Sequence, residues 1–266
     1  MAFLFQTLLR RSYVPYSNDP NAAIAVLADG RWIPGVRIES ASFPLTIPAV
    51  TAALVGAQAL VGLEAVVGVH AHKPFTVAEH DLIQVALGRP TRAVTDHTVL
   101  IESSANAPDL DDPVDIPDLI GHPQDGTTIA TAAFIQRARE EAMRRARVPH
   151  SDFPVGCIVE TRGGVAVPGV NVEFDDWTRG LCAERTALAL TLAYGLVPAA
   201  LYISCIKAPG GTPCGACRQV IAELVPDGPI WIDHHDAPPR KTTAQVLLPD
   251  AFVGDGLLHA PTDRSA

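Results

Sequence analysis

The chain has 266 residues, of which 48% are hydrophobic and 18% charged, and its formal net charge is −9. This length and composition suffice for one large or two ordinary globular domains. The acidic balance argues against a nucleic-acid partner, because surfaces that track phosphates are usually basic, and it favours a small-molecule partner. All five cysteines lie in the second half without a disulfide framework, which favours the reducing cytoplasm.

Two apolar stretches near the beginning of the chain could suggest export or a membrane. Residues 1–12 carry their positive charges after the apolar run, the reverse of a secretory signal, and predict an ordinary helix. Residues 47–69 are long enough for a membrane span, but Gln58, Glu64 and several glycines interrupt them. They predict a core helix followed by a buried strand, and we expect no membrane partner.

The chain repeats itself. A shift of 134 pairs residues 10–54 with residues 144–188 without a gap, and 15 of the 45 pairs are identical. The identical pairs include glycines and prolines at expected turns, a collinear pattern that biased composition does not explain. Self-similarity of this kind indicates two copies of one domain. We place them at residues 1–124 and 125–266.

Each copy predicts the same elements in chain order. A helix leads to two strands around a glycine turn, and then come a helix, a strand, a second helix and a last strand. The first helices are expected at 1–12 and 129–147, the paired strands within 22–38 and 156–172, the next strands at 65–69 and 200–206, and the last at 92–96 and 229–233. Alternating strands and helices predict an α/β layer structure whose later strands are parallel.

Three cysteines in the second copy stand at predicted helix starts. Cys182 precedes one apolar helix pattern, and Cys214 and Cys217 form a C-x-x-C at the start of another. Unpaired backbone N–H groups and the helix dipole favour thiolates at such positions. Three converging thiolates suit a zinc ion that keeps its fourth position open for water. The alternative is a redox C-x-x-C pair with Cys182 unrelated to it.

Two charged residues directly follow Cys182. Three thiolates leave zinc with a net charge of −1, and Arg185, on the same helix face as Cys182, could draw off charge by donating hydrogen bonds to the sulfurs. Glu184 would lie beside the metal without binding it, where it could move protons between water and substrate. Without the cysteines, both would be interpreted as surface residues.

The first copy lacks this cluster. The shift of 134 places Pro48 opposite Cys182, and a later shift of 135 places Glu79 opposite Cys214 and Leu82 opposite Cys217. We therefore expect one Zn²⁺ per chain, bound by the second copy.

At this point the residues resemble a known family, the zinc-dependent cytidine deaminases of free-nucleoside metabolism. The matching segments are "FPVG" (153–156), "NVE" (171–173), "CAER" (182–185), "PCGACRQV" (213–220) and "LLPDAF" (247–252). Their order and spacing agree with the family over roughly residues 129–258. The resemblance implies a three-layer α/β/α fold with a mixed sheet, present twice, and hydrolytic deamination of cytidine or deoxycytidine to the uracil nucleoside plus ammonia, a reaction of pyrimidine salvage.

The resemblance also implies roles for single residues. Cys182, Cys214 and Cys217 would bind zinc, and Arg185 would donate hydrogen bonds to their sulfurs. Glu184 would transfer protons. Asn171 and Glu173 would bind the ribose, and Phe153 and the Ala183 backbone would contact the base. The residues alone support less. Asn171 and Glu173 share a strand face, which could suit a diol but is also typical of an exposed strand edge, and Phe153 could simply be a core residue.

The chain departs from the family in one segment of the second copy. Residues 174–181 read "FDDWTRGL" where the family is close to "NASYGLTI", whereas residues 40–47 of the first copy keep "SASFPLTI". This segment leaves open a deaminase of a modified or antibiotic cytosine nucleoside. A second alternative, independent of the segment, is a non-catalytic protein whose structural zinc site is closed by a fourth ligand from elsewhere in the chain.

The first copy resembles a deaminase domain that has lost its metal. Arg37 stands where Asn171 does, and Asp19 stands where Phe153 does. The resemblance implies that neighbouring subunits close the active sites, so a fused inactive copy could supply walls and interfaces. We expect a homodimer of two-domain chains that resembles a tetramer.

Overall fold

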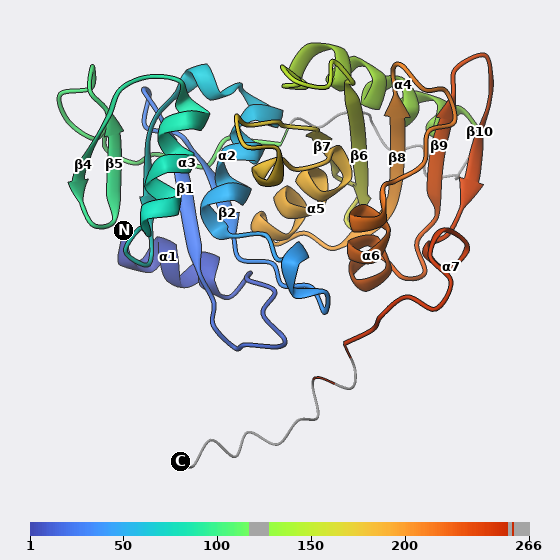
Figure 1. Ribbon diagram of the computed structural model, residues 1–266, viewed down its shortest axis with the longest axis horizontal. Coiled ribbons are helices and arrows are strands. Elements are labelled where there is room, and N and C mark those ends of the chain that lie inside the picture. The colour runs from blue at the N-terminus through green and yellow to red at the C-terminus, as the bar shows by residue number, and fades with distance from the viewer. Residues whose placement is uncertain (117–127, 255–256, 258–266) are drawn as a thin grey trace.

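The computed structural model describes residues 1–116, 128–254 and 257. Within them the chain forms two five-stranded sheets, with helices between and around them, and the two sheets stand side by side in Figure 1. The expected domain boundary at 124/125 lies outside the described residues.

The first half contains the expected helices and strands in the expected order, and one further strand that was not predicted follows the expected last strand. They are α1 (Ala2–Leu9), β1 (Ala22–Leu27), β2 (Trp32–Val36), the short 3-10 turn η1 (Phe43–Leu45), α2 (Ala49–Leu60), η2 (Leu63–Ala65), β3 (Val66–Ala71), α3 (Val77–Leu87), β4 (Thr91–Thr95) and β5 (Thr98–Ile101). The stretch at 47–69 is thus a core helix and a buried strand, as predicted. No helix in the described part of the chain is long and apolar enough to cross a membrane.

The second half repeats the order of the first. It contains α4 (Thr128–Arg145), β6 (Val155–Thr161), β7 (Ala166–Val170), η3 (Trp177–Arg179), α5 (Ala183–Ala193), β8 (Pro198–Cys205), α6 (Gly215–Leu224), β9 (Ile230–His234), β10 (Ala237–Thr242) and α7 (Ala244–Leu247). Hairpin β1–β2 has the same strand register as hairpin β6–β7 under the shift of 134. The prediction of one α/β fold present twice is confirmed.

The two sheets differ in their later strands. The orders are β2-β1-β3-β5-β4 and β10-β9-β8-β6-β7. In the second sheet β8 and β9 are parallel, as predicted, and the sheet is mixed. In the first sheet β3 pairs with β5, and both this pair and β4–β5 are antiparallel. The prediction of parallel later strands is therefore wrong for the first copy.

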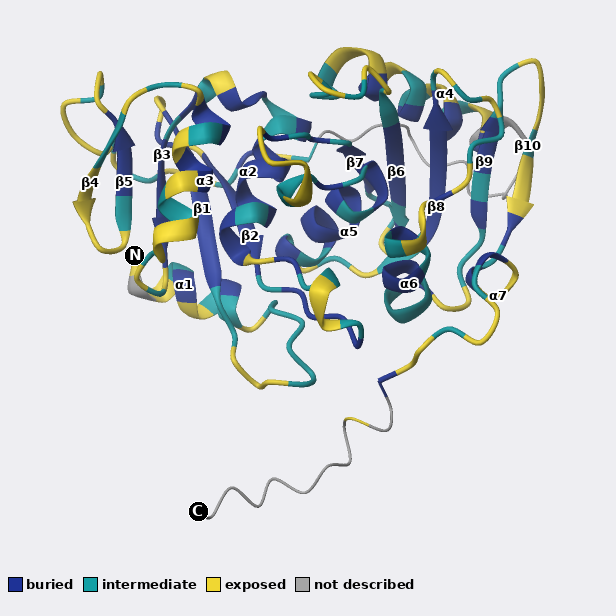
Figure 2. Cartoon of the chain, in the orientation of Figure 1, coloured by how far each residue is buried: buried dark blue, intermediate teal, exposed yellow. Residues whose placement is uncertain are grey.

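The burial of the two terminal hairpins explains this difference. In the first copy the apolar strand is β5, which is mostly buried, while β4 is largely exposed. In the second copy the apolar strand is β9, while β10 is mostly exposed and contains two prolines, which cannot donate backbone hydrogen bonds. The apolar strand lies inside and the polar strand at the edge in both halves, as Figure 2 shows.

Two glycines allow the helices to lie close to the second sheet on opposite faces. A Cβ on Gly156 of β6 would stand 1.9 Å from the Ala138 carbonyl oxygen of α4, and a Cβ on Gly169 of β7 would stand 2.4 Å from the Ala183 carbonyl oxygen of α5. Neighbouring residues of this hairpin point to alternate faces, and Gly169 pairs with Cys157. The second copy therefore has the expected three layers, with α4 on one face and α5 on the other.

The central helices of the two copies, α2 and α5, pack against each other between the sheets (Figure 1). Two arginines at equivalent positions join their ends. Arg11 donates to the Ala193 carbonyl at the end of α5 (2.9 Å), and Arg145 donates to the Val61 carbonyl at the end of α2 (2.7 Å). Each copy thus satisfies a terminal helix carbonyl of the other.

Candidate active site

Three cysteine sulfurs meet where two helices begin. Cys182 is the N-cap of α5, Cys214 is the N-cap of α6, and Cys217 lies in the first turn of α6. The sulfurs of Cys182 and Cys214 are 3.7 Å apart, and all three lie within 4.8 Å of one another. Two sulfurs bound to one tetrahedral zinc ion would be about 3.8 Å apart. The predicted convergence is confirmed, and the sulfurs fit a zinc ion.

The sulfurs do not ionise independently. Hydrogen bonds from Cys182 and Cys217 and from the α6 backbone lower the pKa of Cys214. The pKa values of Cys182 and Cys217 are raised, chiefly by hydrogen bonds with the neighbouring cysteine sulfurs.

Glu184 lies in the first turn of α5 and is only 4% exposed. The Cys217 thiol donates to its Oε2 at 3.3 Å. Burial, and secondarily the negative charge of Cys214, raise the pKa of the Glu184 carboxyl. A carboxyl with a raised pKa at the edge of a cavity can both accept and return a proton near neutral pH.

Arg185 faces the first copy. Its Nη2 donates to the Leu45 carbonyl of η1 at 3.0 Å, and its buried Nε has no hydrogen-bond partner. Among the described residues no hydrogen bond joins Arg185 to a sulfur. The expected contact with the sulfurs is thus replaced in this structure by a backbone contact from the first copy.

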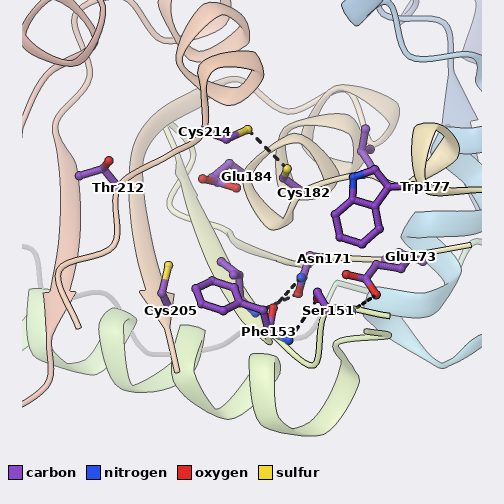
Figure 3. Close-up of a pocket in the computed structure, with 14 residues that line it drawn as sticks. Ser151, Phe153, Asn171, Glu173, Trp177, Cys182, Glu184, Cys205, Thr212 and Cys214 are labelled. Carbon is purple, nitrogen blue, oxygen red and sulfur yellow. Dashed lines mark hydrogen bonds between the residues drawn. The ribbon is translucent and has the colours of Figure 1, made fainter. Parts of the chain in front are cut away.

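A cavity of about 540 Å³ opens beside the sulfurs (Figure 3). Six of its lining residues were predicted from the sequence: Phe153, Asn171, Glu173, Cys182, Glu184 and Cys214. Ala183 is not among its lining residues, and its side chain is fully buried. Sequence reasoning missed Ser151, Thr212 and Cys205 as lining residues. Cys205 lies at the end of an apolar strand, and only the position of β8 reveals that this end borders the cavity.

Asn171 and Glu173 both bind the backbone of the segment before β6. The Asn171 amide accepts from Val155 N and donates to the Phe153 carbonyl, both at 2.9 Å. Glu173 accepts from the backbone N–H groups of residues 150 and 151. Burial alone would raise the pKa of Glu173, but these hydrogen bonds outweigh it and the pKa is lowered. Glu173 is therefore an ionised acceptor at neutral pH.

The first copy keeps the glutamate contacts to the backbone, but ion pairs stand where the second copy has Asn171 and Phe153. Glu39 accepts from the backbone of Tyr16 and Ser17, as Glu173 does in the second copy. Arg37 pairs with Glu39 at 3.0 Å and with Asp19 at 3.3 Å. Charged side chains bound to one another thus replace the amide and the aromatic ring of the second copy.

The helix starts also correct the alignment of the two copies. Thr76 is the N-cap of α3 and forms a capping box with Glu79, so the N-caps match Thr76 with Cys214 and Glu79 with Cys217. The predicted pairing of Glu79 with Cys214 is wrong. The segment between strand and helix is longer in the second copy, at 206–213 against 72–75, and a single shift could not accommodate it.

Comparisons with known proteins agree with the fold and the site. A family model described as the cytidine and deoxycytidylate deaminase zinc-binding region matches residues 130–228, and a second model with the same description matches residues 6–70. The chain belongs to this cytidine deaminase family, and both of its halves match the family.

Two relatives and one solved structure each match about half of the chain over most of their own length. A cytidine deaminase of Sporosarcina psychrophila is 35% identical over 128 residues, which are 47% of this chain and 90% of the relative. A cytidine deaminase of Mycobacterium tuberculosis is 36% identical over 126 residues, 47% of this chain and 89% of the relative. The crystal structure of a cytidine deaminase from Burkholderia pseudomallei has 38% identity and a TM-score of 0.43, covering 46% of this chain and 98% of its own.

Proposed function

We propose that this chain is a zinc-dependent cytidine deaminase with one Zn²⁺ and one active site, both in the second copy. The observation that carries the proposal is the convergence of three cysteine sulfurs, two of which, those of Cys182 and Cys214, line the cavity together with the buried Glu184. In the described first copy, a capping box stands at the helix start that corresponds to Cys214 and Cys217. Membership of the family supports both the metal and the reaction.

The chain's own residues would divide the chemistry between them. Zinc held by Cys182, Cys214 and Cys217 would lower the pKa of water at its open position. Glu184 would accept a proton from the attacking water and return it to the ring nitrogen and the departing amino group, and its raised pKa suits both transfers. Arg185 would offset negative charge near the sulfurs through its unpartnered Nε.

Residues across the cavity from the sulfurs would bind the nucleoside. Figure 3 shows Phe153, Asn171 and Glu173 on this side. The ionised Glu173 and the amide of Asn171 would bind ribose hydroxyls, and the half-exposed ring of Phe153 would pack on the pyrimidine. Cytidine and deoxycytidine both fit this set of groups.

The two alternative functions are less well supported. Cys182 and Cys214 border the cavity, so the cluster is open on one side, whereas a structural zinc site is closed by four protein ligands. A modified cytosine nucleoside was suggested by the unusual residues 174–181, of which only Trp177, Gly180 and Leu181 line the cavity.

We further propose domains at residues 1–124 and 125–266, a homodimer of such chains, and a reducing cytoplasmic location in which none of the five cysteines forms a disulfide. The contacts between α2 and α5 support the idea that the first copy substitutes for a neighbouring subunit.

The proposal is tested by a panel of nucleosides combined with metal analysis. We expect the purified protein to contain one zinc per chain and to convert cytidine and deoxycytidine, measured by loss of ultraviolet absorbance. Cys214→Ser should lose both zinc and turnover, whereas Cys157→Ala, which alters a buried thiol outside the cluster, should keep both. Zinc-loaded protein that deaminates no cytosine nucleoside would contradict the proposal.

A further inference from the structure

The turn that carries Trp177, residues 175–180, forms part of the cavity wall without being packed into the core. The Trp177 side chain lines the cavity but is 67% exposed, and its nearest recorded ring contact is with His150, at 6.5 Å between ring centroids. The two ends of the turn are fixed by the buried Phe174 and Leu181, and Leu181 forms two backbone hydrogen bonds of 2.9 Å with Val172. Between these ends the exposed residues of the turn gain little from burial, so polar contacts contribute to their placement over the cavity.

Contacts within the turn fix its local shape only. Asp176 caps η3 by accepting from Thr178 N at 2.9 Å and from Thr178 Oγ1 at 2.7 Å. The Nε of Arg179 lies 3.6 Å from Asp176 Oδ2. All three residues belong to the turn itself, so these bonds hold it together without fixing where it lies.

One contact joins the turn to the first copy. Arg179 Nη1 donates to Asp81 Oδ2 of α3 at 2.5 Å, and the two residues are 98 positions apart in the chain. Arg179 thus links Asp176 of the turn to a helix of the copy that has lost the cysteines. The carboxylate of Asp81 thus attaches this part of the cavity wall to the helix.

The contact does not follow from the internal repeat. Under the shift of 134, Leu45 corresponds to Arg179, and counting from the helix starts, Gln219 of α6 corresponds to Asp81 of α3. Leucine and glutamine cannot form an ion pair. The contact is therefore present only on the side of the molecule where the helix starts carry cysteines.

We propose that Asp81 of the metal-free copy is a positioning residue for the nucleoside site of the other copy. It holds Arg179, and through Arg179 it sets how far Trp177 stands over the mouth of the cavity. This inference rests on the proposed deaminase function. It assigns the first copy a part in substrate recognition that goes beyond its packing against α5.

The effect should fall on substrate binding and should be small. Both side chains are partly exposed, at 30% for Arg179 and 56% for Asp81, and such ion pairs are weak and screened by salt. Loss of the pair should raise KM for cytidine about two- to fivefold and leave kcat unchanged, because no group that moves protons is touched. The same loss should remove much of the salt dependence of KM.

A double-mutant cycle tests the proposal in the full-length protein. We expect Asp81→Asn, Arg179→Gln and the double variant to raise KM by the same factor, and the charge-exchanged variant D81R/R179D to recover part of it. Asp96→Asn, which alters an exposed aspartate in the turn between β4 and β5, is the matched control and should behave as the wild type. Unchanged KM in Asp81→Asn, or additive effects in the double variant, would overturn the proposal.

A second measurement separates this proposal from the proposed function. Acrylamide quenching of tryptophan fluorescence, with Trp177→Phe to identify the contribution of Trp177, reports on the turn without any turnover. We expect quenching to change in Asp81→Asn and not in Asp96→Asn. If the wild type deaminates no nucleoside while this change is observed, the function fails and the contact stands. If all variants deaminate cytidine alike and quench alike, the positioning role fails and the function stands.

Discussion

Glu184 occupies a position that folding alone would not favour. A carboxyl that is 4% exposed and has a raised pKa destabilises the fold when it ionises, and an alanine or leucine would pack there without this cost. Its neighbours are the sulfurs and the cavity, where such a group can transfer protons. The free-energy cost of burying the Glu184 carboxyl is thus explained by a role in proton transfer and not by a contribution to the stability of the fold.

Replacing Glu184 by glutamine keeps the shape of the side chain and removes its proton transfer. We expect kcat to fall about 10³-fold, since general acid–base groups contribute about 10²- to 10⁴-fold. Zinc content should be unchanged, because Glu184 is not placed as a ligand. Steady-state kinetics and metal analysis on the same sample check both expectations, and loss of zinc together with activity would mean that the carboxylate helps to hold the metal.

At the scale of elements, the position of the cysteines depends on how closely α5 approaches β7. Gly169 permits this approach, and Gly35 permits the same approach of α2 to β2, where a Cβ would stand 2.3 Å from the Ala49 carbonyl oxygen. The two glycines are equivalent under the repeat. Because backbone atoms are in the way, neither site can accept a methyl group without moving its helix.

Gly169→Ala should displace α5 and with it Cys182 and Glu184. We expect it to destabilise the fold by about 1–3 kcal/mol, a usual cost of overpacking, and to weaken zinc binding. Gly35→Ala should destabilise to a similar degree while retaining zinc at one per chain. Denaturant unfolding and zinc titration compare the two variants, and equal zinc affinity in both would contradict this account of the site.

The end of β9 is tied to α4 by a buried carboxylate. Asp233 is 2% exposed and accepts from Arg139 at 2.8 Å, from Ser204 at 2.7 Å and from the His235 backbone N–H at 2.8 Å. Burial alone would raise the pKa of Asp233, but the bonds from Ser204, Arg139 and His235 outweigh it and lower the pKa below its usual value of 3.8.

Because the folded pKa of Asp233 lies below the unfolded value, the ionised carboxylate stabilises the fold above about pH 4 and loses this effect as the pH falls through the folded pKa. Asp233→Asn should cost about 2 kcal/mol at pH 7, allowing for the partly exposed Arg139. The difference from the wild type should narrow below pH 3.8. Chemical unfolding at several pH values checks this, and a difference independent of pH would show that the charge is not responsible.

At the scale of the whole molecule, the two copies share one interior. Buried residues of both halves belong to one hydrophobic core, and the Leu190 side chain of α5 lies against Gly56 of α2, where an added Cβ would meet it at 2.7 Å. Arg11 and Arg145 add reciprocal contacts at the helix ends. The copies should therefore fold together.

An isolated second copy, residues 125–266, should not retain the native fold as a monomer, because the face of α5 that packs on α2 would be exposed. We expect it to aggregate or self-associate, and the full chain to unfold in a single transition. Calorimetry of the full chain and sedimentation of the fragment test this. Two separate transitions, or a stable monomeric fragment with full activity, would show that the copies are independent.

The sequence by itself determined the elements that local chemistry controls. The internal repeat predicted two copies, and periodicity predicted the helices and all strands except the last of each copy, β5 and β10. The spacing of Cys182, Glu184, Cys214 and Cys217 predicted the chemistry, because helix starts are local features. The motif around Asn171 could be assigned only by its resemblance to a family.

Only the tertiary structure decided what depends on contacts between distant segments. It placed β5 rather than β4 beside β3, since the more apolar strand of a hairpin takes the inner position. It aligned Thr76 with Cys214, because loop lengths between strand and helix are not encoded in a periodic pattern. It also joined Arg185 and Arg179 to the first copy, since the partner of a long side chain is fixed by packing and not by its neighbours in the sequence.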